Sequence, residues 1–189
     1  MSSPTTCRDN RFIVTALLLC ISLLLLAGCT PSIHDAVARK DAICVKAMLE
    51  RNPALVRAVD GKNKTAFHTA VTYQKMEVMP LLLEYGADIN ATDITGMTPL
   101  HVAGMLGRSE EAAWLLAHGA DPLIEDEYGD TPLHTAVVFG HGQIIKLLVE
   151  KGISPDRPNG KNERPLEIAK KYRQEKVARY LNHLMGQIN

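Results

Sequence analysis

The chain has 189 residues, which is enough for one domain of ordinary size or for a short array of repeats. Hydrophobic residues make up 46% of it and aromatic residues only 5%, so a core must be built from Leu, Val, Ile, Ala and Met, as is typical of packed helices rather than of a β-sandwich. The 21 basic and 21 acidic side chains balance, which argues against a nucleic-acid-binding protein, because such a protein normally has an excess of positive charge.

The first 28 residues have the features of a secretory signal peptide. Arg8 and Arg11 precede an almost uninterrupted apolar run over residues 12–26. A helix of that length rises about 22 Å, which is shorter than the roughly 30 Å hydrocarbon core of a bilayer. We therefore expect residues 1–28 to be a cleaved signal segment and not a transmembrane helix.

Directly after the apolar run, the residues Leu26-Ala27-Gly28-Cys29 resemble the lipobox of bacterial lipoproteins. The resemblance implies cleavage before Cys29, acylation of Cys29, and attachment to the inner leaflet of the outer membrane, facing the periplasm. Two or more acyl chains hold a protein on a membrane stably, whereas one chain does so only marginally. The alternative is an ordinary secretory signal that has a cysteine at its cleavage site. Cleavage removes the cysteines of the signal segment and Cys29 is acylated, so Cys44 has no cysteine with which to form an intramolecular disulfide. Residues 29–31 would form only a minimal tether.

A unit of 33 residues repeats over the rest of the chain. One series of matching segments is Thr65–Ala70, Thr98–Ala103, Thr131–Ala136 and Arg164–Ala169. A second series is Gly86–Asp88, Gly119–Asp121 and Gly152–Ser154, and a third is Asp60, Asp93, Asp126 and Asn159. All three series keep one register, so the repeat is not a chance similarity.

This pattern resembles the ankyrin repeat in its Thr-Pro-Leu-His form, over residues 32–189. The resemblance implies an all-α solenoid of helix-turn-helix repeats with β-hairpin tips. The residue types agree with it, because Thr caps helices, Pro is tolerated at the first helical position, and Gly ends helices in the left-handed conformation. The expected units are an N-terminal capping repeat at 32–60, full repeats at 61–93, 94–126 and 127–159, and a C-terminal capping repeat at 160–189.

Several local features follow from this register. Ser32 and Asp35 have the spacing of a helix capping box. Pro80 falls in the second helix of the first full repeat, where it costs a backbone hydrogen bond unless it lies in the first turn. Cys44 is expected to face inward. The expected core consists of Ala70, Ala103, Ala136, Ala169, Leu81, Leu82, Trp114, Leu115, Leu147 and Leu148.

The sequence contains no arrangement of residues that points to catalysis. His68, His101 and His134 belong to the repeat itself, and the resemblance implies a structural role for them. No His-Glu-x-x-His motif and no pair of closely spaced cysteines is present. We therefore expect no enzyme activity, metal, cofactor or small-molecule substrate, an expectation that one equivalent of metal in the purified protein would reverse.

The resemblance also implies a concave recognition surface made by the inner helices and the tips. At one position of each inner helix, Tyr73, Leu106, Phe139 and Tyr172 form a series of large apolar side chains, with Met105 and Val138 beside it. On the tips, the candidate contact residues are Lys62, Lys64, Ile94, Met97, Tyr128 and Asp130. Aromatic residues and methionine are common anchors of protein interfaces, which favours a protein partner. The alternative is that this series folds down between adjacent repeats and is half buried.

These features together predict a lipid-anchored protein-binding module. Because the tether is minimal, the partner is expected at or in the membrane. Lipoproteins of this kind resemble immunity proteins that neutralise secreted, periplasm-acting toxins of the lipase type, and that is one form of the prediction. The alternative is an envelope scaffold, or a stress-defence protein, that has no tight toxin partner.

Overall fold

The computed structural model describes residues 32–39 and 42–188 of the chain. The predicted signal peptide and Cys29 lie outside this part. The described helices are α2 (Ile33–Ala38), α3 (Ala42–Arg51), α4 (Ala66–Thr72), α5 (Met79–Glu84), α6 (Pro99–Leu106), α7 (Ser109–Ala117), α8 (Pro132–Phe139), α9 (Gly142–Glu150), α10 (Pro165–Lys171) and α11 (Glu175–Ile188), with a 3-10 helix η1 (Pro53–Arg57) after α3. None of them is both long enough and apolar enough to cross a membrane.

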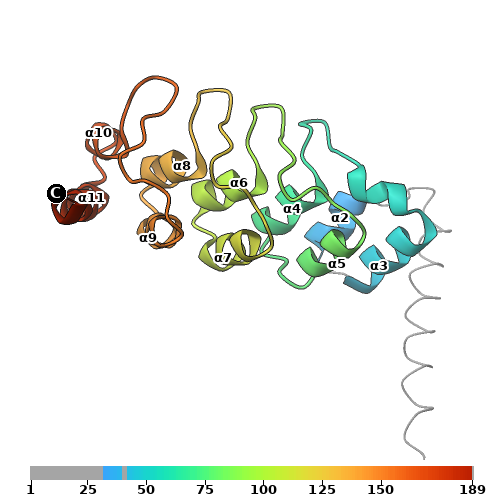
Figure 1. The fold of residues 1–189 in the computed structure, drawn as a ribbon. Helices are drawn as coiled ribbons and strands as arrows, with labels where there is room; N and C mark the ends of the chain where they lie inside the picture. The colour runs from blue at the N-terminus through green and yellow to red at the C-terminus, as the bar shows by residue number, and fades with distance from the viewer. Residues whose placement is uncertain (1–31, 40–41, 189) are drawn as a thin grey trace, which may run out of the picture.

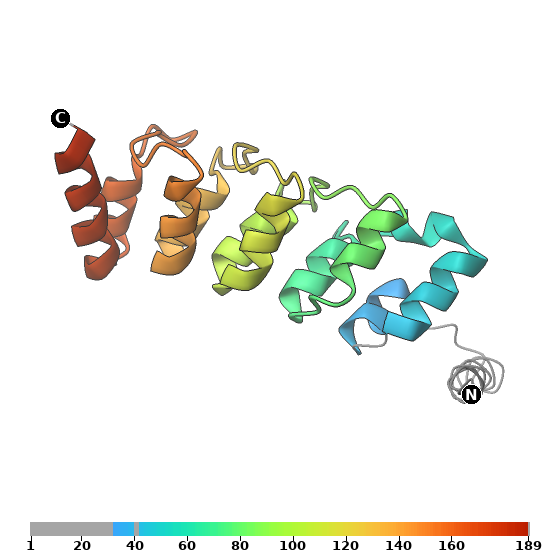
Figure 2. The ribbon, with the colours of Figure 1, turned by 60° about the horizontal axis from the view of Figure 1, so that its bottom comes forward.

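The helices stack in pairs to form an elongated solenoid (Figures 1 and 2). Figure 1 shows α2, α4, α6, α8 and α10 in one row and α3, α5, α7, α9 and α11 in a second row beside it. The loops that join consecutive pairs all project to the same side, next to the first row. This arrangement confirms the all-α solenoid predicted from the repeat.

Each helix of the first row begins with a hydrogen bond from the backbone N–H of its N-cap residue to the side chain three residues later. In α6, the Thr98 side chain accepts from the backbone N–H of His101, and the His101 ring accepts from the backbone N–H of Thr98 at 3.1 Å. In α10, Glu167 takes the place of the histidine, and its carboxylate accepts from the backbone N–H of Arg164 at 2.8 Å. At the other end of the solenoid, Ser32 and Asp35 form the predicted capping box.

Small residues allow the first-row helices to pack closely on their neighbours. The alanines predicted in the core are all fully buried, namely Ala70, Ala103, Ala136 and Ala169. Cys44 is also buried, as predicted. Pro80 lies in the first turn of α5, where its missing N–H would have no partner within the helix, so the proline does not break the helix.

The second-row helices bury only part of their predicted core. Leu82, Leu115 and Leu148 are fully buried, whereas Leu81 and Leu147 are partly buried at its edge. Trp114, which the sequence placed in the core, is also only partly buried. The centre of its ring is 6.3 Å from that of Phe67, and the ring stacks at 3.8 Å on His118, an exposed residue one turn later.

Neighbouring units are held together by side chains that reach back to the preceding unit. In the turn before α9, His141 donates through Nε2 to the carbonyl oxygen of Met105 at 3.1 Å. Gln174 makes the equivalent bond to the carbonyl of Val138 at 3.0 Å, and Arg108 reaches the carbonyl of Thr72 at 3.4 Å. Sequence analysis missed these bonds because an arginine, a histidine and a glutamine share the role.

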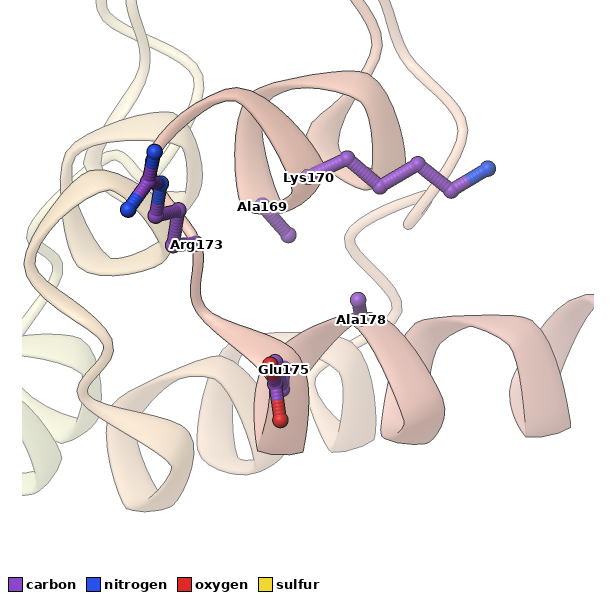
Figure 3. A pocket seen from close by; sticks show the side chains of 5 residues that line it. All are labelled: Ala169, Lys170, Arg173, Glu175 and Ala178. Atoms are coloured by element: carbon purple, nitrogen blue, oxygen red, sulfur yellow. The ribbon is translucent and has the colours of Figure 1, made fainter.

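The last helix pair encloses a small hollow. It lies between α10 and α11 and has a volume of about 230 Å³, and in it Ala169 and Ala178 point toward one another while Lys170 and Arg173 extend away (Figure 3).

The outer face of this last helix pair is polar. The repeat register places exposed Lys170 where the preceding unit has Val137, which is fully buried. A charged side chain at this position opposes the stacking of a further unit, as a terminal cap requires.

Candidate protein-binding surface

Each tip is closed by one Asp or Asn side chain. The Oδ1 atom of Asp93 accepts hydrogen bonds from the backbone N–H groups of Thr95 and Met97, at 2.9 and 3.1 Å. The same pair of bonds occurs at Asp60, Asp126 and Asn159. The third repeat series in the sequence is therefore the set of residues that fold the tips.

The tips differ from the β-hairpins that the resemblance implied. The described residues contain no strand, because each tip is short and has few backbone hydrogen bonds between its two arms, such as that from Asp93 to Met97. The tips are instead bonded to one another. Backbone N–H groups of Ile94, Glu127 and Gly160 donate to carbonyl groups of the preceding tip at 3.0 to 3.1 Å. The row of tips is thus a continuous wall beside the inner helices.

The repeat histidines connect each inner helix to the next tip. The His101 ring accepts from Thr98 N–H through Nδ1, so its proton is on Nε2, which donates to the Asp130 carbonyl at 3.0 Å. His68 and His134 bond in the same way to the carbonyls of Met97 and Arg157. Burial lowers the pKa of all three histidines below its ordinary value, because the charged ring would lose its hydration. These contacts confirm the predicted structural role.

The aromatic members of the predicted apolar series are about half exposed. The exposed fractions of Tyr73, Phe139 and Tyr172 are 55%, 49% and 50%, and all three residues lie at the ends of inner helices. Leu106 is partly buried against the core. Leu106 thus fits the alternative of a series folded down between repeats, while the three aromatic side chains are about half exposed and half buried, as either prediction allows.

Most of the predicted contact residues surround one hollow, which we name the central hollow. It has a volume of about 350 Å³ and lies between the inner helices and the tips of the second and third full repeats and the C-terminal unit. It is lined by Met97, Met105, Asp126, Tyr128, Asp130, Thr135, Val138, Phe139, Lys161 and Tyr172. The predicted residues that do not line it are Lys62, Lys64, Tyr73, Ile94 and Leu106.

Three lining residues were absent from the predicted contact set. Asp126 belongs to the third repeat series and Lys161 lies on the tip of the C-terminal unit, so the register gives their tip positions but not their place in the hollow. Thr135 is on the inner helix α8, one turn before Phe139, and its position in the hollow depends on how the units pack. The contact roles of all these residues remain predictions.

The walls of the central hollow are held in place by polar contacts. The Lys161 ammonium lies 4.8 Å from the centre of the Tyr128 ring, in cation–π contact. The Asp130 carboxylate accepts a 2.7 Å bond from the Asn159 side chain. These contacts, together with half-exposed aromatic rings on rigid helices, suit the binding of another molecule by shape and charge rather than the catalysis of a reaction.

A family model for ankyrin repeats, in three copies, matches residues 33–126 and again residues 118–189. The chain belongs to the ankyrin-repeat family. Ankyrin repeats generally serve as protein-binding modules without enzymatic activity. Among the described residues, no group of three or more His, Cys, Asp or Glu side chains is placed to hold a metal ion.

A curated relative shares a short part of this ankyrin-repeat chain. A stretch of 53 residues is 42% identical to the Serine/threonine-protein kinase VIK of Arabidopsis thaliana. The match covers 28% of this chain and 12% of that protein, and it lies in the repeat region. The similarity therefore concerns the repeats and does not extend to a kinase activity.

Proposed function

We propose that this ankyrin-repeat chain is a lipid-anchored module that binds a protein partner with its inner helices and tips, on the periplasmic side of a bacterial outer membrane. The observation that carries the proposal is the row of half-exposed aromatic rings, Tyr73, Phe139 and Tyr172, beside the wall of tips. Large rings on rigid helices lose little conformational entropy on binding, so they make efficient interface anchors.

The anchor is supported by the sequence Leu26-Ala27-Gly28-Cys29. Since only Thr30 and Pro31 separate Cys29 from the capping box at Ser32, the solenoid would lie close to the bilayer. A binder with so short a reach suits a partner that acts on the membrane. A toxin that attacks lipids is such a partner, and we include neutralisation of a periplasm-acting, lipase-type toxin in the proposal.

Removing the exposed rings should abolish partner binding while the fold is retained. In a variant with Tyr73→Ser, Phe139→Ser and Tyr172→Ser, we expect partner affinity to fall at least about 100-fold, because interface aromatic residues often contribute about 2 kcal/mol each. Co-purification of the partner from solubilised native membranes measures the loss, and thermal unfolding measures the fold. The matched control is Ile43→Ser, Val59→Ser and Leu123→Ser, whose side chains are 53%, 47% and 45% exposed outside the inner-helix row.

Two results would contradict the binding proposal. If the control variant loses the partner equally, binding depends on the total exposed apolar surface and not on the rings of the inner helices. Collapse of the thermal transition only in the ring variant would assign the rings to the core and favour a scaffold that has no tight partner.

The anchor has a separate test. We expect Cys29→Ser to abolish both acylation and globomycin-sensitive processing, because the acyl chains are attached to this sulfur. The control is Cys44→Ala, which removes the buried cysteine of the N-terminal unit and should leave acylation and processing unchanged. Acylation or globomycin-sensitive processing that persists in the Cys29→Ser protein would exclude a lipid anchor at this position.

A further inference from the structure

We infer that the central hollow binds an extended segment of the partner in which a bulky apolar side chain stands next to an arginine or lysine. This inference rests on the proposed function and specifies the chemistry of the partner. It is carried by the charge and the apolar content of the hollow, which are complementary to such a segment.

The floor of the hollow provides the apolar part of the site. Met105 on α6 and Val138 and Phe139 on α8 line it, and all three are partly or half exposed. Met97 contributes a second methionine from the tip side. Methionine adapts its shape to different partners, so this floor would accept Leu, Met or Phe side chains.

The tip side of the hollow provides negative charge. Asp126 and Asp130 both line it, and neither takes part in the salt bridges found among the described residues. Lys161, the basic residue of the lining, lies against the Tyr128 ring. The nearby Lys171 is bonded to Glu163 at 2.6 Å. The hollow therefore has a net negative charge that a cationic side chain of the partner would complement.

The two carboxylates differ in what they are able to do for a partner. Asp126 closes its tip through two backbone hydrogen bonds, so changing it would alter the loop itself. Asp130 is partly exposed and holds only the Asn159 amide through its side chain. Asp130 is thus the residue that determines specificity for a positive charge, and Asp130→Asn removes the charge with little change in shape.

The test uses the full-length protein in nanodiscs and an array of synthetic ten-residue peptides. The peptides consist of Ser and Thr except at two places. One central position is Phe, Leu, Met or Ala, and Arg, Gln or Glu is placed either one or two positions after it. We expect peptides with Phe, Leu or Met next to Arg to bind best, and we expect Arg→Glu in the peptide to weaken binding at least tenfold. Asp130→Asn should reduce the preference for Arg over Gln to less than twofold. The control Glu110→Gln, on the outer helix α7, should retain the preference.

Each other outcome overturns the inference. Preference for Glu, or a preference for Arg that persists in Asp130→Asn, would show that the hollow does not select a cation. Binding that lacks any charge preference but is lost with Phe139→Ser would overturn the inference and leave the proposed function intact. Failure of every peptide to bind would also overturn it, while co-purification from native membranes tests the proposed function independently.

Discussion

Lowering the pH from 7.5 to 5.5 is expected to reduce the free energy of unfolding by up to about 4 kcal/mol, through His68, His101 and His134. Each ring is buried in its neutral form, accepting through Nδ1 and donating through Nε2, and burial lowers its pKa in the folded chain. In the unfolded chain each ring titrates near its ordinary pKa of about 6.5. Unfolding therefore takes up protons, and stability is lost as the pH falls through about 6.5 toward the lowered pKa of the folded state.

The size of this effect follows from the number of rings. One histidine contributes at most about 1.4 kcal/mol per pH unit, and typical domains are stable by only about 5–15 kcal/mol. Urea unfolding at a series of pH values, followed by circular dichroism, measures the slope. His101→Gln should lower the slope by about a third. A urea midpoint that stays constant between pH 7.5 and 5.5 would be incompatible with buried, neutral histidines.

Gly129→Ala is expected to destabilise the protein by about 2–4 kcal/mol, because it combines backbone strain with a steric overlap. Gly129 has a φ of +72°, and a Cβ atom added to it would overlap the Cα of Gly160 in the next tip and lie 2.5 Å from its backbone nitrogen. The Gly160 N–H also donates to the Gly129 carbonyl at 3.0 Å. The two tips could not separate to relieve the overlap without losing this bond and the contact between Tyr128 and Lys161.

Substitutions at two other glycines measure the backbone strain separately from the steric overlap. Gly119 has a φ of +95° but nothing within 4 Å of an added Cβ, so Gly119→Ala should cost only the backbone strain of about 1–2 kcal/mol. Gly61 has neither a positive φ nor a close neighbour, so Gly61→Ala should leave the unfolding midpoint almost unchanged. Equal effects for Gly119→Ala and Gly129→Ala would show that the contact between tips contributes nothing to stability.

Local chemistry made much of the fold predictable. Helix starts depend on hydrogen bonds between residues three positions apart, as in Ser32 with Asp35 and Thr98 with His101, so adjacent sequence is sufficient to identify them. Helix ends depend on the backbone of a single residue, and Gly86 and Gly119 adopt the expected positive φ. Burial of Ala103 and its equivalents follows from the same register.

The sequence by itself thus determined the repeat, its capping residues, its buried alanines and the all-α class, because each depends on neighbours along the chain. Only the tertiary structure decided which residues meet across units. The bond from His141 to Met105 joins positions 36 residues apart, and the chemically different side chains that share its role hid the pattern. The central hollow likewise joins residues from Met97 to Tyr172, and its shape is set by the way successive units pack, which no local residue pattern encodes.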